Sequence, residues 1–369
     1  MAQVPDNSHD GDVEFDDPAS EVADRQSSPP SYEIATYPAD FTLEVLATKW
    51  DSNELFIPPF QRGFVWSQVQ ASKLIESFLV GLPVPSIFLY TDRSSERQMV
   101  VDGQQRLRSV FHYFEGYFGE SNSKGARTVF KLKGLSEDSP YYNKSYADLL
   151  REDEAAARRL RNSVLRAFVI RQLNPQDDTS VFHIFERLNT GGTLLHNQEV
   201  RNAVCAGPFN NMLHRLNANP HWRQILGKPK LDSRMRDVEL ILRFLALHHA
   251  GDKYVKPMKD FMSRYMRTHA QADELLIERY EREFTETART VVSHLGERPF
   301  HLYAGFNSSA YDSVFHAIAK NLGSDLDGLT ERWATLRESP KLEALVRGGT
   351  TDVEQVQGRL ALVERTLFP

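Results

Sequence analysis

The stretch "MVVDGQQRLRSVFHYF", residues 99–114, predicts a buried strand that leads directly into a helix. The apolar run before Asp102 is typical of a buried strand. After Gly103, apolar residues recur at helical spacing at Leu107, Val110, Phe111 and Phe114. A simple strand-to-helix crossover requires only the glycine. The polar residues around it therefore raise the question of a binding site.

The residue types at this junction suit a phosphate group. Gly103 permits close backbone approach, and the N-terminus of a helix presents N–H groups and a positive dipole end. Arg106 offers a planar fork for a phosphate, and Gln104 and Gln105 offer amides to a phosphate, a base or a sugar. Asp102 suits a metal ion, an arginine or a ribose hydroxyl. The alternative is a plain turn with Asp102 as helix cap and Arg106 solvated, and from the residues alone the two interpretations carry equal weight.

Further elements are expected on both sides of this stretch. Ser67 as a cap and Gly81 as a stop delimit a helix over 68–80. The other expected elements are short or buried strands at 55–60, 85–92, 97–103, 128–134 and 163–173, one charged helix over 147–161, and a helix from about 178 to Gly191-Gly192.

Beyond about residue 197 nearly every segment has helical periodicity, with helices expected over 235–251, 272–296, 308–323 and 352–368. The expected fold class is therefore α+β, with a small α/β domain followed by an all-helical domain. We place the first at 41–200 and the second at 201–369.

Composition limits the class of protein. The 369 residues are 41% apolar and 25% charged, as in an ordinary globular protein of about two domains. The net charge is −6; residues 1–40 hold ten acidic residues and one arginine, or −9, which leaves −6 + 9 = +3 for the rest. This acidic segment is expected to be a disordered tail. Cys205 is the single cysteine, which excludes an intramolecular disulfide framework. No apolar run is long enough to span a bilayer and the N-terminus is acidic, so the expected location is the cytoplasm, with no membrane partner.

Two more segments combine arginine with amides. The first is "IPPFQRGFVW", residues 57–66, with Gln61 and Arg62 beside aromatic residues. The second is "FERLNTGGTLLHNQEVRNAV", residues 185–204, with Arg187 and Asn189 at the end of a predicted helix. Considered alone, each is best explained by ordinary surface residues. Neither has the spacing of a P-loop or of a dinucleotide-binding glycine motif.

Together, and in this order, the three motifs resemble the N-terminal domain family of the GmrSD restriction enzymes. That family carries a hallmark Asp-Gly-Gln-Gln-Arg, here at residues 102–106. The resemblance covers about residues 42–205 and implies a ParB/sulfiredoxin-like fold. "DSRMRDVELILRFLAL", residues 232–247, also looks like the family.

The resemblance implies a nucleotide-binding site. Gly103, Gln104, Gln105 and Arg106 would cradle the triphosphate of ATP, GTP or CTP, and Asp102 would be a catalytic or Mg²⁺-orienting carboxylate, with Arg106 also catalytic. The remaining nucleotide-binding positions that it implies are Gln61, Arg62, Arg187 and Asn189. Members act in prokaryotic defence against foreign DNA, and their hydrolysis of nucleoside triphosphate is thought to gate a nuclease.

One departure from the family concerns the nuclease domain. Many members end in an HNH-type nuclease domain, and the best matching residues here, His301, Asn307 and His316, have no hairpin before them. The expected function is therefore a nucleotide-binding, NTP-hydrolysing defence component that acts on DNA through a partner nuclease or other subunit on another chain. The alternatives are a ParB-like DNA nickase centred on Asp102 and Mg²⁺, or a non-catalytic module that senses DNA or binds a partner. Self-association through the helical half is a further expectation.

Overall fold

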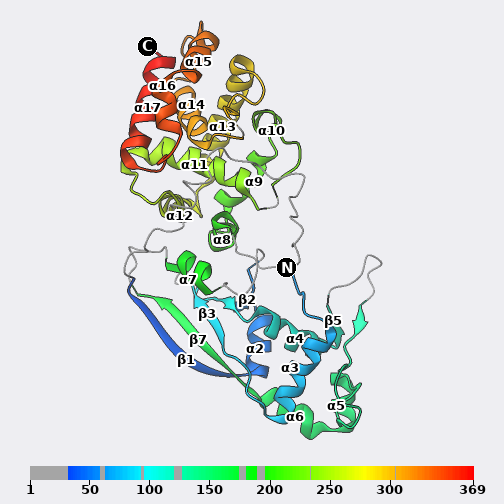
Figure 1. Cartoon of the computed structure of the whole chain (residues 1–369). Coiled ribbons are helices and arrows are strands. Elements are labelled where there is room, and N and C mark those ends of the chain that lie inside the picture. Colours follow the sequence, from blue (N-terminus) through cyan, green and yellow to red (C-terminus); the bar gives the residue numbers. More distant parts are fainter. Residues whose placement is uncertain are drawn as a thin grey trace, which may run out of the picture. The chain divides into compact units, whose positions relative to one another are not determined.

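The computed structural model describes residues 32–58, 63–92, 95–119, 127–173, 180–188, 196–232, 234–303 and 305–369. The chain divides into two compact units, Ser31–Leu194 and a second that includes Leu195–Pro369. We call them the sheet unit and the helical unit. The predicted fold class, a sheet-containing N-terminal region followed by a helical C-terminal region, is confirmed (Figure 1).

The sheet unit is built on a mixed five-stranded sheet. Its strands, in spatial order, are β1 (Ile34–Thr42), β7 (Val164–Gln172), β3 (Ile87–Thr91), β4 (Gln98–Asp102) and β2 (Leu55–Phe56). β1 and β7 are antiparallel, β7 and β3 parallel, β3 and β4 antiparallel, and β4 and β2 parallel. The strand that leads into the Asp-Gly-Gln-Gln-Arg motif therefore lies inside the sheet, with a neighbour on each side.

Helices cover this sheet and complete its core. They are α2 (Leu43–Asp51), α3 (Gln68–Val80), α4 (Gln104–Glu115), α5 (Tyr146–Glu152), α6 (Glu154–Asn162) and α7 (Ser180–Leu188). Figure 1 shows α2, α3 and α4 gathered on one side of the sheet. Leu89 and Val100 of the strands share a buried cluster with Leu107 and Val110 of α4 and Ile75 of α3. Burial of these apolar side chains fixes α4, and hence its first turn, against β3 and β4.

The predicted boundaries of α3 are confirmed. Ser67 is its N-cap, and Ser67 and Gln70 form a reciprocal capping box. Gly81 ends the helix in the left-handed conformation with a φ of 79°. The strands predicted around 85–92, 97–103 and 163–173 are also present, as β3, β4 and β7.

Three expectations need correction. The acidic composition predicts a disordered tail up to residue 40, but residues 34–40 belong to β1, which pairs along its whole length with β7. The charged helix expected over 147–161 is two helices, because Asp153 ends α5 and its side chain accepts a hydrogen bond from Ala156 N at 2.9 Å to begin α6. The strand expected over 128–134 is only β6 (Thr128–Val129), paired with β5 (Tyr117–Phe118).

The helical unit consists of helices packed around aromatic residues. Its helices are α8 (Asn197–Val204), α9 (Pro208–Asn217), α10 (Pro220–Leu226), α11 (Arg236–Ala250), the 3-10 turn η1 (Gly251–Lys253), α12 (Met258–His269), α13 (Glu274–Leu295), α14 (Ser308–Lys320), α15 (Leu329–Arg337), α16 (Pro340–Val346) and α17 (Val353–Leu367). Trp222, Phe244, Phe284 and Phe315 are buried and in mutual ring contact. The four long helices predicted here, α11, α13, α14 and α17, are all present.

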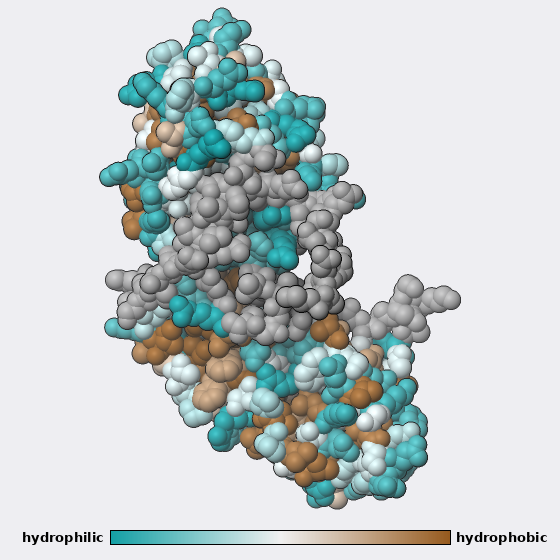
Figure 2. Space-filling model, viewed as in Figure 1, coloured by the Kyte–Doolittle hydropathy of each residue, from teal (hydrophilic) through white to brown (hydrophobic). Residues whose placement is uncertain are grey.

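Polar side chains spread over the visible face of the helical unit, while apolar ones are more concentrated on the sheet unit (Figure 2). Within the described part of the chain, no helix has the length and apolar character needed to cross a membrane.

Candidate functional site

The turn between β4 and α4 requires glycine. Gly103 has a φ of 101°, a conformation that residues with a side chain rarely adopt. A Cβ at this position would lie 2.3 Å from Cγ2 of Ile87 and 2.8 Å from its Cβ. The backbone therefore passes directly over the start of β3, and only glycine fits there.

The first turn of α4 differs from those of its neighbours. Its N-cap residue, Gly103, has no side chain that could accept a backbone N–H, and its hydrogen-bond ladder begins with Leu107 N donating to Gly103 O at 3.0 Å. By contrast, α2, α3, α5 and α6 each begin with a side chain that accepts a backbone N–H; these caps are Thr42, Ser67, Ser145 and Asp153. Asp102 does not cap α4, so the plain-turn interpretation, in which Asp102 is the helix cap, is wrong on this point. An uncapped helix start has the backbone N–H groups and the dipole that favour an anion.

Arg106 is bound by the protein rather than solvated. Its Nη1 donates to the carbonyl oxygens of Pro85 at 2.6 Å and Ser86 at 2.7 Å, and its Nη2 donates to Oδ2 of Asp102 at 2.7 Å. The arginine side chain is 14% exposed and that of Asp102 is 42% exposed. Arg106 thus fastens the segment before β3 and orients a carboxylate that solvent can reach.

Gln105 joins two of the three sequence motifs. Its Oε1 accepts from Val65 N at 3.0 Å and Trp66 N at 3.3 Å, and its Nε2 donates to Gly63 O at 3.1 Å. The ring of Phe64 lies 4.8 Å from that of His112 on the same helix. The segment that follows Gln61 and Arg62 is therefore held against α4. Gln61 and Arg62 themselves lie outside the described residues.

The other predicted site residues are placed less completely. Gln104 is 8% exposed at the start of α4. Arg187 is exposed in the last turn of α7, a helix that packs against β4. Asn189 lies outside the described residues. The described residues thus bring the Asp102–Arg106 motif together with 63–66, and of the third motif the described residues 185–188 lie on α7, which packs against β4.

Arg201, near the end of the third motif, has a structural role in the helical unit. It is fully buried, and its guanidinium donates to Ser263 Oγ, Lys259 O and Glu239 at 3.0, 3.0 and 3.1 Å. It thereby holds α8 to α11 and α12. The plain structural interpretation is correct for this residue.

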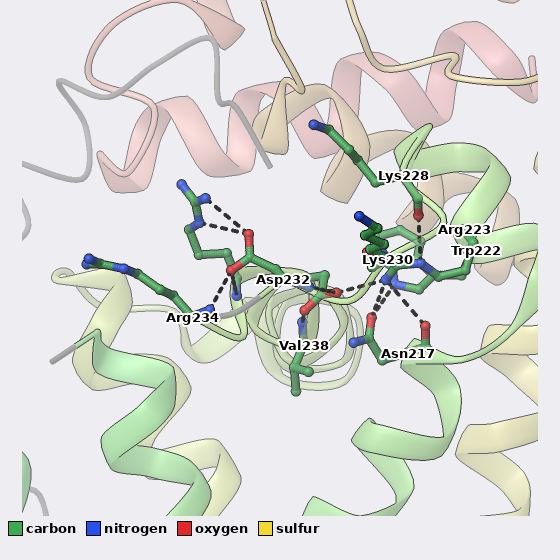
Figure 3. A network of polar contacts seen from close by, with 10 residues as sticks. Asn217, Trp222, Arg223, Lys228, Lys230, Asp232, Arg234 and Val238 are labelled. Atoms are coloured by element: carbon green, nitrogen blue, oxygen red, sulfur yellow. Dashed lines mark hydrogen bonds and ion pairs between the residues drawn. The ribbon is translucent and has the colours of Figure 1, made fainter. Parts of the chain in front are cut away.

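The "DSRMRD" segment, residues 232–237, is also a structural network (Figure 3). Oδ2 of the fully buried Asp237 accepts from Arg223 Nη1 at 2.8 Å and from Asp232 N at 3.0 Å. Asp232 in turn accepts from Arg234 N at 2.9 Å and from Arg236 Nε at 3.1 Å. These bonds fasten the turn before α11 to α10.

The donor set fits a magnesium–nucleotide complex. Mg²⁺ is usually held by one or two carboxylates together with substrate phosphates, and Asp102 supplies an accessible carboxylate beside an uncapped helix start. Sequence reasoning missed the backbone carbonyls of Gly63, Pro85 and Ser86, which bind the amide of Gln105 and the guanidinium of Arg106. No local signal marks a carbonyl as a partner, because every residue has one.

Comparison with known proteins agrees with the motif-based resemblance. Residues 43–205 match the family model described as GmrSD restriction endonuclease, N-terminal domain. A search among curated proteins found no match. A domain of this kind implies a role in a restriction or anti-phage defence system. The stretch 43–205, from the start of α2 to just past the end of α8, is therefore similar to the GmrSD N-terminal domain family.

Proposed function

We propose that this protein is a nucleotide-binding and NTP-hydrolysing component of a prokaryotic restriction system, and that it regulates a nuclease on another chain. The observation that carries the proposal is the β4–α4 junction. There an uncapped helix start lies next to Asp102, a carboxylate that is accessible and held by Arg106.

In this proposal the backbone at the start of α4, from Gly103 through Gln105, receives the triphosphate. Mg²⁺ bound with the nucleotide at Asp102 would neutralise phosphate charge. Asp102 also accepts the proton of the attacking water, which adds to the γ-phosphorus as the bond to the β-phosphate oxygen breaks. The products are a nucleoside diphosphate and inorganic phosphate.

Arg106 acts mainly as a positioning residue in this account. Its fork is bound to Asp102, Pro85 and Ser86, so it sets the direction of the carboxylate. Gln105 does the same for residues 63–66, which follow Gln61 and Arg62 in the sequence. Those two residues, with Arg187 and Asn189, are the proposed remaining contacts to the nucleotide.

The proposal that the nuclease is on another chain is supported by the structural partners of two HNH-like residues, Asn307 and His316. Asn307 caps α14 by accepting from Ala310 N at 2.8 Å and donates to Val346 O at 3.1 Å. His316 lies within the same helix, with Nδ1 3.2 Å from Nδ1 of His248. In the described ranges Asn307 therefore serves packing rather than metal-assisted hydrolysis. DNA is the proposed target of the assembled system.

Calorimetric titration of the purified chain with ATP, GTP, CTP and UTP in Mg²⁺ tests the binding step. We expect saturable binding of at least one nucleotide, retained in Asp40→Asn. Asp40 is a matched control because it also pairs with an arginine, Arg166 at 2.8 Å, on the same sheet. Absence of binding to all four nucleotides contradicts the proposal and favours a sensing or partner-binding module.

Plasmid incubation separates the proposal from the nickase alternative. We expect intact supercoiled plasmid when the chain is incubated with Mg²⁺ or Mn²⁺, with or without NTP. Nicking that is lost in Asp102→Asn and kept in Asp40→Asn would instead assign the chemistry at Asp102 to DNA cleavage.

A further inference from the structure

Three metal-ligating side chains converge in the helical unit. His248 and His249 lie in the last turn of α11, and Glu283 lies on α13. Nε2 of His248 is 2.9 Å from Oε1 of Glu283, and Nε2 of His249 is 2.8 Å from Oε2. Among the residues that the structure describes, this is the group of His, Cys, Asp and Glu whose ligand atoms all lie within 4.8 Å of one another.

The spacing of these atoms is close to that of a tetrahedral metal site. Zinc binds imidazole nitrogen and carboxylate oxygen at about 2.0–2.2 Å, so neighbouring ligand atoms are about 3.3 Å apart. His248 Nε2 lies 2.9 Å from Oε1 and His249 Nε2 lies 2.8 Å from Oε2 of Glu283, a few tenths of an ångström shorter than this, and one ligand atom of each residue lies within 4.8 Å of the other two. Two imidazoles and one carboxylate leave a fourth position for water.

The two imidazole rings are held in place by their neighbours. The ring of His249 stacks on Tyr280 with centroids 4.4 Å apart, and that of His248 stacks on Phe244 at 5.4 Å. Nδ1 of His248 is 3.2 Å from Nδ1 of His316 on α14. A ligating histidine usually bonds an outer partner through its other ring nitrogen, and His316 occupies that position.

Accessibility also suits a metal. The side chains of His248, His249 and Glu283 are 10%, 15% and 19% exposed, so the group is largely enclosed and still reachable from solvent.

We infer that His248, His249 and Glu283 form a binding site for a divalent transition metal of the Zn²⁺ class, which ties the end of α11 to α13. Nitrogen and oxygen ligands in this ratio suit zinc and its first-row neighbours rather than Mg²⁺ or Ca²⁺, which prefer oxygen alone. The site is separate from the β4–α4 junction and does not depend on nucleotide binding. The other outcome of the test is a hydrogen-bonded His–Glu–His bridge that takes no metal.

The test uses the full chain prepared without a polyhistidine tag and stripped of metal by a chelator. Zn²⁺ is then titrated in competition with a chromogenic chelator. We expect one Zn²⁺ per chain. Glu283→Gln and His249→Ala should each weaken binding more than about 100-fold, and His316→Ala about 10–100-fold as an outer partner. His294→Ala, on the same helix as Glu283 and outside the cluster, should bind as the wild type does.

Two further measurements distinguish loss of the metal site from misfolding of a variant. Zn²⁺ should raise the melting temperature of the wild type and of His294→Ala, because it binds the native state, and leave that of Glu283→Gln unchanged. Co²⁺ added to the wild type should give the visible absorption bands of a tetrahedral site. Wild-type protein that binds no Zn²⁺, or folded variants that bind it equally well, would overturn the inference.

Discussion

Nη2 of Arg106 lies 2.7 Å from Oδ2 of Asp102, across the turn that joins β4 to α4. The other terminal nitrogen of the same guanidinium bonds Pro85 O and Ser86 O. The aspartate that begins the Asp-Gly-Gln-Gln-Arg motif and the arginine that ends it thus form one unit with the segment before β3. Residues that act as a unit are expected to have non-additive effects when changed.

Arg106→Lys should destabilise the sheet unit by about 1–3 kcal/mol, because one ammonium cannot bond two carbonyls and a carboxylate in the fork geometry. Urea denaturation measures the change. Arg166→Lys, which alters the exposed pair with Asp40, should cost less than about 1 kcal/mol. Equal losses in the two variants would show that Arg106 is an ordinary surface cation.

Gly103→Ala should destabilise the protein by about 2–4 kcal/mol, since it combines an unfavourable φ with overlap on Ile87. Gly116→Ala, at the other end of α4, is the matched control. Gly116 also has a positive φ, of 87°, but nothing lies within 4 Å of its added Cβ, so only about 1 kcal/mol is expected. Denaturation midpoints of the two variants give the comparison, and an equal cost would exclude the close approach to β3.

Gln105→Leu should release the segment 63–66 from α4. The variant removes the acceptor of two backbone N–H groups and the donor to Gly63 O, at a cost of about 1–3 kcal/mol. Hydrogen exchange at the amides of Val65 and Trp66 should accelerate, and nucleotide affinity should fall. Unchanged exchange at these two amides would mean that Gln105 does not hold the segment.

Asp312→Ala in the helical unit should cost about 3–5 kcal/mol, because it leaves two buried cations without their carboxylate. Arg243 Nε lies 2.7 Å and Arg359 Nη2 3.2 Å from Oδ2 of Asp312, whose side chain is fully buried, as is that of Arg359. Glu343→Ala breaks the exposed pair with Arg347 and should cost less than about 1 kcal/mol. Chemical denaturation of both variants tests the difference; similar costs would contradict a tightly coupled buried network.

Local signals in the sequence predicted much of the fold. Ser67 and Gly81 delimit α3 because a capping box and a left-handed glycine act within one turn of the chain. The strand–turn–helix at 99–114 was predicted for the same reason. Long-range strand pairing was not predicted. β1 is stabilised by β7, which lies more than a hundred residues away in the sequence, so the acidic composition of residues 1–40 did not indicate where β1 begins.

At the β4–α4 junction the sequence shows which polar residue types are present, but it does not show which atoms they bind. Donors that suit phosphate oxygens also suit carbonyl oxygens, so the sequence could not show that Arg106 and Gln105 bind Pro85, Ser86 and Gly63. The cluster of His248, His249 and Glu283 was missed because it joins two helices and has no fixed ligand spacing along the chain.

Hydrolysis of NTP by Asp102→Asn is the most direct measure of the central claim. Asparagine keeps an acceptor for Arg106 while removing the charge that holds a proton or a metal ion. The account predicts NTP hydrolysis by the wild type, a loss of about 100-fold or more in Asp102→Asn with folding intact, and wild-type rates in Asp40→Asn. Hydrolysis by Asp102→Asn at the wild-type rate would contradict the account.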